Sequence, residues 1–191
     1  MSINATTNYM SASTIDQWME RKTEGLYGNM RGAMDESNTR ADAEQALNDI
    51  KAKILNAQKD GTDARDLQKE IADTMKQYGD IPEVTKTLTP IETDLTKRIA
   101  KADGPQTYGN DLASVTLQPT PGQIPVTLSK DDSDNWTKEI GDTVDGLGKQ
   151  DQMGMINIQE FNSQINQAKQ IASALLDAAD KSANAIINHI S

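Results

Sequence analysis

Apolar residues recur at alternating steps of three and four along most of the chain, which is the spacing of one face of an α-helix. The pattern begins after Thr14 and, with turn signals at Gly61 and Gly79, continues to Ala102. The sequence therefore predicts an N-terminal helical region over residues 14–102.

Several residues within this region disfavour an uninterrupted helix. Gly25, Gly28 and Gly32 each cost about 1 kcal/mol relative to Ala in a helix interior. Pro90 has no backbone N–H group, so we predict that it kinks or divides its helix. We expect the first part of the region to be broken, or weak without a partner.

The clearest periodicity lies in a predicted C-terminal helical region, residues 130–191. Its apolar positions keep a heptad register through four repeats, which is typical of a coiled coil. The predicted coiled-coil packing positions are Ile158, Phe161, Ile165, Ala172, Leu175, Ala179 and Ile186. A second apolar set is predicted to serve assembly and comprises Ile171, Leu176, Ala183, Ile187 and Ile190. Trp136 and Ile140 share one face of the preceding segment and are interpreted as a core anchor.

The remaining two segments differ in composition. Residues 1–13 are polar and almost uncharged, which predicts disorder. Residues 103–129 are rich in Pro and Gly, and their β-like runs at 113–117 and 124–128 predict a small hairpin about the turn at 119–122. The predicted fold is thus mainly α, an elongated helical hairpin or coiled coil of N- and C-terminal helices with a small irregular or β-hairpin insertion.

Composition narrows the classes of function. The chain has 19 Lys and Arg against 29 Asp and Glu, a formal net charge of −10, which argues against a nucleic-acid partner. It contains no Cys and one His, so thiol chemistry is excluded and conventional catalytic groups are scarce. No stretch is apolar enough to predict a membrane span. We expect no catalytic residues, no metal and no cofactor.

Two motifs resemble functional sites but lack residues that such sites require. The Gly, Ile, Glu and Phe spacing around Gly154 matches the end of an EF-hand loop, but Lys149 and Met153 occupy positions where calcium requires oxygen ligands. His189 near the chain end has no Ser or Asp that its spacing places beside it, and we interpret it as an end-of-helix residue.

Parts of the chain resemble proteins of type III secretion systems. The sequence NWTKEI at 135–140, with the heptad helix that follows it, resembles the C-terminal half of IpaD-type needle-tip proteins. The sequence MGMINIQ at 153–159 resembles EspA-type filament proteins and the Bordetella-type tip-filament protein. The N-terminal half is similar through MDES at 34–37 and the Ala-, Asn- and Gln-rich residues 41–55.

This resemblance implies a long hairpin of terminal helices and export through an uncleaved signal in the polar N-terminus. It implies a secreted structural protein at the needle tip on the bacterial surface, which caps or extends the needle by self-assembly. The implied partners are other copies of the chain, the needle subunit, translocator proteins and a secretion chaperone. The glycines, including Gly146, Gly148 and Gly154, depart from the uninterrupted helices of these families.

Two other classes of function stay open at this point. The first is an intracellular coiled-coil binding module or a secretion chaperone, which would share the heptads but would not be exported. The second is an enzyme, which the single His and the absence of Cys disfavour. Tip cap and filament are not separated by the sequence.

Overall fold

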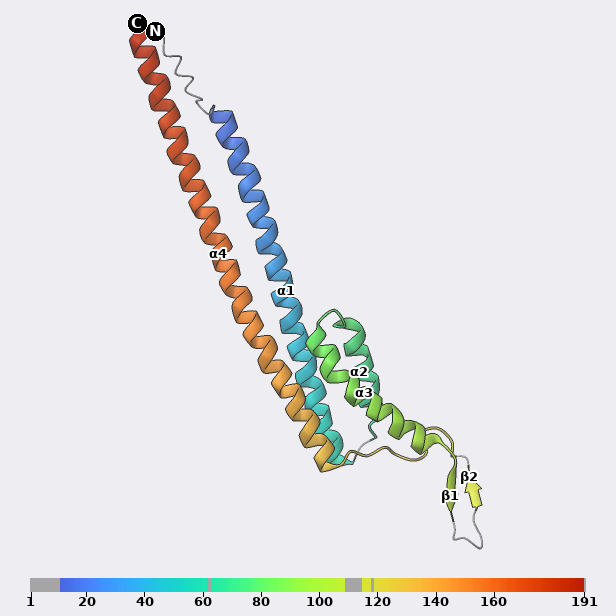
Figure 1. Ribbon diagram of the computed structural model, residues 1–191. Helices are drawn as coiled ribbons and strands as arrows, with labels where there is room; N and C mark the ends of the chain where they lie inside the picture. Colours follow the sequence, from blue (N-terminus) through green and yellow to red (C-terminus); the bar gives the residue numbers. More distant parts are fainter. Residues whose placement is uncertain (1–10, 62, 109–114, 118, 191) are drawn as a thin grey trace, which may run out of the picture. The chain divides into compact units, whose positions relative to one another are not determined.

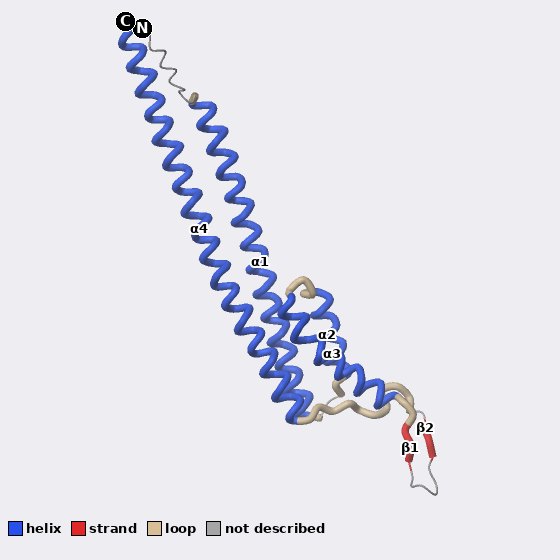
Figure 2. The backbone as a smooth tube through the Cα atoms, viewed as in Figure 1, coloured by secondary structure: helices blue, strands red, loops and turns tan. Residues whose placement is uncertain are grey.

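The computed structural model describes residues 11–61, 63–108, 115–117 and 119–190 and is mainly helical (Figures 1 and 2). Its elements in chain order are α1 (Ala12–Asp60), α2 (Arg65–Gln77), α3 (Pro82–Asp103), β1 (Gln106–Tyr108), β2 (Val115–Leu117) and α4 (Lys130–Ile190). The chain forms two compact units. We call residues 38–152 the bundle unit, and residues up to 37 together with those from 153 the hairpin unit.

Both long helices are continuous, so a break at the glycines, one of the two predicted outcomes, is wrong, and weakness of the isolated segment stays a prediction. Helix α1 passes through Gly25, Gly28 and Gly32 without a break, and α4 likewise contains Gly146, Gly148 and Gly154. Breaking a helix at each glycine would release backbone hydrogen bonds from their partners, which costs more than about 1 kcal/mol of lost propensity. Pro90 also lies inside an undivided α3, because Leu88 and Ile91 on either side of it are fully buried.

The bundle unit contains the second part of α1, then α2 and α3, and the first part of α4. Thr87 of α3 lies 2.6 Å from Thr143 of α4 (Oγ1 to Oγ1), and Gln150 of α4 donates a 2.8 Å hydrogen bond to Glu83 of α3. Later residues of one helix therefore face earlier residues of the other. Gln68 of α2 contacts Glu92 of α3 in the same antiparallel sense. The four segments form an up-down-up-down bundle.

One glycine of α4 marks a close approach to α1. Lys51 Nζ lies 3.3 Å from the position that a Cβ atom would take at Gly141, so a larger side chain there would displace the lysine. The absence of a side chain at Gly141 therefore leaves room for the Lys51 side chain of α1.

Large aliphatic side chains from all four helices fill the core of the bundle unit. They sit at helical spacing on each segment, which explains why these amphipathic stretches pack together. Its fully buried large members are Leu47, Ile50, Ile54, Ile71, Val84, Leu88, Ile91, Leu95, Ile140 and Leu147.

The segment between α3 and α4 does not pair as predicted. Strand β1 pairs antiparallel with β2, with Gln106 opposite Leu117. The predicted second run, 124–128, is not a strand. Val126 and Leu128 are instead buried in the bundle core, and the Val126 carbonyl accepts a hydrogen bond from Ala64 N–H. Pro125 between them has no N–H group for a ladder, so the run packs by its side chains.

Helix α4 begins at a capping box whose acid also binds α3. The Ser129 hydroxyl accepts a bond from Asp132 N–H, and Asp132 Oδ2 accepts from Ser129 N–H, as the sequence pattern Ser129 to Asp132 indicates. Arg98 of α3 donates to the same carboxylate at 2.8 Å. The Arg98 hydrogen bond lowers the pKa of Asp132 below its usual value.

Core packing in the bundle unit predicts a contrast between two leucines. Leu88→Ala should lower the free energy of unfolding by about 2–5 kcal/mol, because the side chain is fully buried and its removal leaves a cavity. Leu55→Ala, at a position 44% exposed on α1, is the matched control and should change it by less than about 1 kcal/mol. Urea unfolding followed by circular dichroism measures both, and equal losses would contradict this core.

The Arg98–Asp132 pair predicts a pH dependence. Since the folded-state pKa of Asp132 is lowered, its ionised form stabilises the fold above the unfolded value of about 4, and this contribution is lost as pH falls through the folded value. Asp132→Asn should therefore lower Tm at pH 7, and the difference from the parent should shrink below about pH 4. Thermal melts across pH test this, with the exposed neighbour variant Asp131→Asn as control. A difference that stays constant to low pH would contradict it.

Candidate assembly surface

The hairpin unit consists of two helical segments that run side by side in opposite directions, residues 12–37 of α1 and 153–190 of α4 (Figure 1). Lys169 Nζ lies 3.3 Å from the Tyr27 hydroxyl, and 6.0 Å from the centre of its ring. This contact fixes which turn of α4 lies beside which turn of α1.

The shared seam of the hairpin unit is narrow. Ile15 and Leu26 of α1 are buried, as are Ile165, Ala168 and Ala172 of α4. Since no other described element belongs to this unit, each helix buries its stripe mainly against the other. The alanines of α4 leave little bulk between the two backbones, so the helices can approach closely.

The predicted coiled-coil positions differ in burial. Ile165 and Ala172 are buried, and Ile158, Phe161 and Ala179 are half-buried. Leu175 is 39% exposed, whereas the adjacent Leu176 is half-buried. An α-helix has about 3.6 residues per turn, so the turn after Ala172 returns to the seam at a point between Leu175 and Leu176. A strict heptad register therefore wrongly places Leu175 at the centre of the seam. The Ile186 side chain lies outside the described part of the chain.

The second apolar set, which was predicted to serve assembly, does not form one continuous surface. Ile171 and Ile187 are 51% and 62% exposed, yet their sixteen-residue spacing places them about 160° apart around the helix. Leu176, five residues after Ile171, lies about 140° from it and is half-buried. Ala183 is exposed, and the Ile190 side chain lies outside the described residues. The set therefore divides between two sides of the seam.

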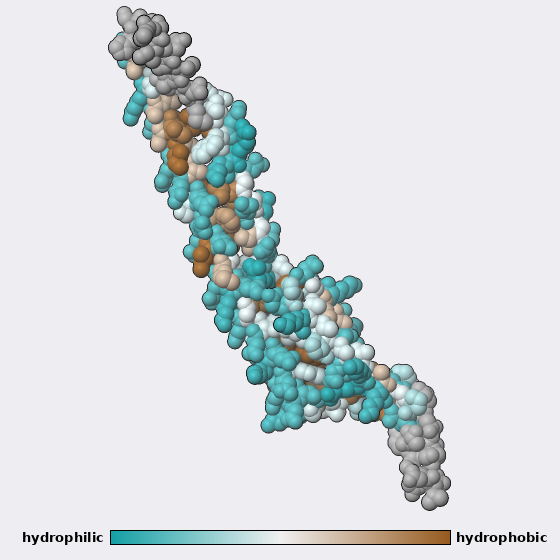
Figure 3. Space-filling view, viewed as in Figure 1, coloured by the Kyte–Doolittle hydropathy of each residue, from teal (hydrophilic) through white to brown (hydrophobic). Residues whose placement is uncertain are grey.

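Exposed large apolar side chains concentrate on the hairpin unit. Among the described residues they are Trp18, Tyr27, Met34, Met153, Met155, Ile156, Ile171, Leu175 and Ile187 there, against Leu55 on the bundle unit. Brown side chains along the α1 and α4 ends in Figure 3 show part of this surface. The residues on α1 were not predicted, and their off-seam apolar character was the available signal.

The α4 part of the hairpin unit is poor in charge. Residues 153–190 of α4 contain five charged side chains, Glu160, Lys169, Asp177, Asp180 and Lys181. Depletion of charged residues, together with aromatic and Met side chains, is the compositional signal of a protein interface. The exposed part of the hairpin unit therefore has the composition of a surface that another protein covers.

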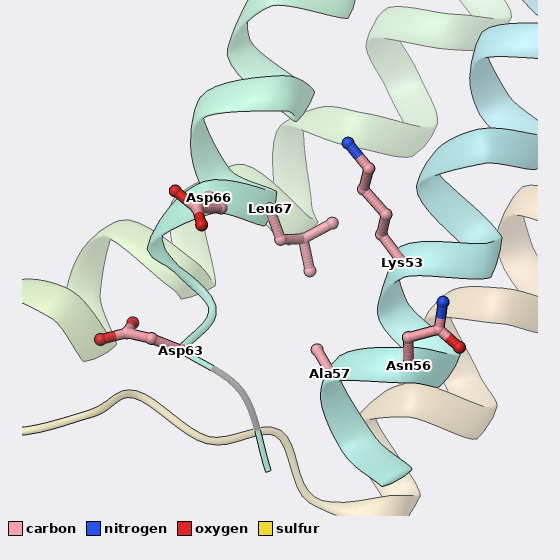
Figure 4. A pocket seen from close by; sticks show the side chains of 6 residues that line it. All are labelled: Lys53, Asn56, Ala57, Asp63, Asp66 and Leu67. Atoms are coloured by element: carbon pink, nitrogen blue, oxygen red, sulfur yellow. The ribbon is translucent and has the colours of Figure 1, made fainter. Parts of the chain in front are cut away.

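The bundle unit has a hollow of about 360 Å³ between α1 and α2, lined by Lys53, Asn56, Ala57, Asp63, Asp66 and Leu67 (Figure 4). Its charged groups serve the fold. Lys53 forms an ion pair with Glu70, and Asp63 forms one with Arg65, which also bonds Asp103 at 2.6 Å. The hollow has no convergent polar set for a ligand.

The sequence also singled out an EF-hand-like segment and His189 as candidate sites. The EF-hand-like residues around Gly154 lie within α4, so they form no loop. The side chain of His189 lies outside the described residues. Among the residues that the structure describes, no cluster of His, Asp and Glu could hold a metal ion, and no helix is long and apolar enough to cross a membrane.

The predicted anchor residues lie in the bundle unit. Ile140 is fully buried in its core, and Trp136 packs partly buried against that core with the Arg98 guanidinium 5.8 Å from its ring centre. This cation–π contact joins the start of α4 to α3.

Comparison of the chain with protein-family models, curated proteins and solved structures finds no significant match.

Two isoleucines of the hairpin unit, the buried Ile165 and the exposed Ile171, predict different effects of substitution by Asp. Ile165→Asp places a carboxylate in the seam and should destabilise the hairpin unit by more than about 3 kcal/mol. Ile171→Asp adds the same charge at an exposed position and should change stability by less than about 1 kcal/mol. Hydrogen exchange of residues 153–190 measures both. A parent-like exchange profile in Ile165→Asp would contradict the seam.

Proposed function

We propose that this chain is a structural, self-assembling component of a type III secretion system that is exported and caps or extends the needle. The observation that carries the proposal is the hairpin unit, in which two helices share one seam and leave apolar side chains exposed on both sides. A protein that acts by packing against further copies requires such a surface.

Two further features support this role over the alternatives. The first is the resemblance of short segments of the sequence to needle-tip and filament proteins. In the hollow of the bundle unit, Lys53 and Asp63 are held in ion pairs, which leaves fewer charged groups there for a catalytic mechanism. The exposed surface favours contact with other protein chains, and the proposed partners are copies of this chain, the needle subunit, translocators and a secretion chaperone.

The start of α1 allows a clean test of the proposed export. Ser11 caps this helix, because Thr14 N–H donates to its hydroxyl at 3.2 Å. A deletion of residues 2–10 therefore keeps the cap and every described residue. If the proposed signal lies in this segment, the deletion should abolish secretion and leave the helix content and Tm unchanged.

The measurement is the uncleaved protein in culture supernatant, compared between a strain with a working secretion ATPase and one without it. Circular dichroism of the purified deletion variant is the folding control. Secretion of the full chain that does not depend on the ATPase would overturn the proposed function, and cytoplasmic retention would favour an intracellular binding module.

A further inference from the structure

The Tyr27–Lys169 contact divides the hairpin unit into two opposite sides. Both residues lie on one side of the seam, where they meet. Trp18 precedes Tyr27 by nine residues, and Ile171 follows Lys169 by two, which turns each of them about 160–180° away from the contact. Trp18 and Ile171 therefore share the other side. We call the two sides the Tyr27 face and the Trp18 face.

The Trp18 face combines apolar side chains with open space. Trp18, Ile171 and Leu175 are 38%, 51% and 39% exposed. Gly25 and Gly32 lie on the same side by their spacing from Tyr27, and no atom lies within 4 Å of a Cβ built on either of them. Side chains from another molecule can therefore contact the α1 backbone here.

Charges on the Trp18 face change sign along its length. Lys22 and Glu160 lie on this face by their spacing from Tyr27 and Lys169. Near the start of α1, a surface hollow is lined by Thr14, Trp18, Arg21 and Lys22, so this end is basic. Glu160, eleven residues before Ile171 on the antiparallel helix, makes the other end acidic.

The Tyr27 face carries the opposite order of charge. Glu20 and Asp180 lie on this face near the start of α1, whereas Arg31 and Lys169 lie further along it. Its exposed apolar side chains include Tyr27, Met34 and Ile187. This face therefore runs from acidic to basic where the Trp18 face runs from basic to acidic.

The two faces match in position when copies lie parallel. Glu20 is two residues, or about 3 Å along the axis, from the level of Lys22. The pairing of Tyr27 with Lys169 places Glu160 at the level of residue 36, about 8 Å along the axis from Arg31, within reach of an arginine side chain. A parallel neighbour thus brings each charged end against its opposite.

We propose that the Trp18 face of one copy binds the Tyr27 face of a second, parallel copy of this chain. This contact rests on the self-assembly proposed above and specifies its geometry. It joins two different surfaces, so it repeats from copy to copy and builds a ring or a filament. It also covers the apolar side chains of both faces, whereas pairing of two Trp18 faces leaves those of the Tyr27 face exposed.

Two single substitutions at exposed positions test this contact on the purified full chain. Ile171→Asp blocks the Trp18 face. Met34→Asp blocks the Tyr27 face, where the Met34 side chain is 46% exposed. Sedimentation velocity should show large assemblies for the parent and monomers for each variant alone. An equimolar mixture of the two variants should give heterodimers and nothing larger, because each variant keeps one intact face. Parent-like melts of both variants control for folding.

A charge exchange tests the parallel alignment. Lys22→Glu alone and Glu20→Lys alone should each raise the protein concentration required for assembly at least tenfold. The double variant has the net charge of the parent and should restore assembly. Loss of assembly in Ile171→Asp with full dimers in Met34→Asp would instead show a symmetric contact and overturn the proposal. A parent that stays monomeric at all concentrations would also overturn it, while export dependent on the secretion ATPase would leave the proposed function standing.

Discussion

Two helices that pack only against each other share a single seam, and many apolar side chains off that seam stay exposed. In the bundle unit, α2 and α3 cover the apolar sides of α1 and α4, so the large side chains around Leu47 and Leu147 are fully buried. The hairpin unit has no such cover among its described elements. Its exposed Trp18 and Ile171 are therefore a consequence of architecture, and they offer an apolar surface for contact with another chain.

The seam also explains how glycine-containing helices can stay intact. A 61-residue α4 contains glycines that lower its propensity, but its buried positions recur from Ile140 through Ile165 to Ala172. Tertiary packing of an amphipathic face supplies most of the stability of a helix in a protein, so local propensity does not decide continuity. The glycines of these helices differ in surroundings, since Gly141 lies beside the Lys51 side chain whereas Gly25 and Gly32 border open space.

Local patterns predicted the features that depend on local chemistry. The turn at Gly61, whose φ is 63°, lies where the sequence predicted a turn signal. The burial of Val126 beside Ala64 depends on residues that are far apart in the sequence, so periodicity alone could not give it. The division of Ile171 from Ile187 follows from helical geometry, whereas the side to which Trp18 belongs required the contact of Tyr27 with Lys169.

The two tryptophans of the chain are divided between its two units, Trp18 in one and Trp136 in the other. Their surroundings differ, since Trp18 is 38% exposed beside a surface hollow and Trp136 is packed beneath a guanidinium. Each indole is thus an intrinsic fluorescent reporter of a single unit. A protein in which one tryptophan is replaced by phenylalanine would emit from the remaining unit alone, which makes the cooperativity between bundle and hairpin directly observable.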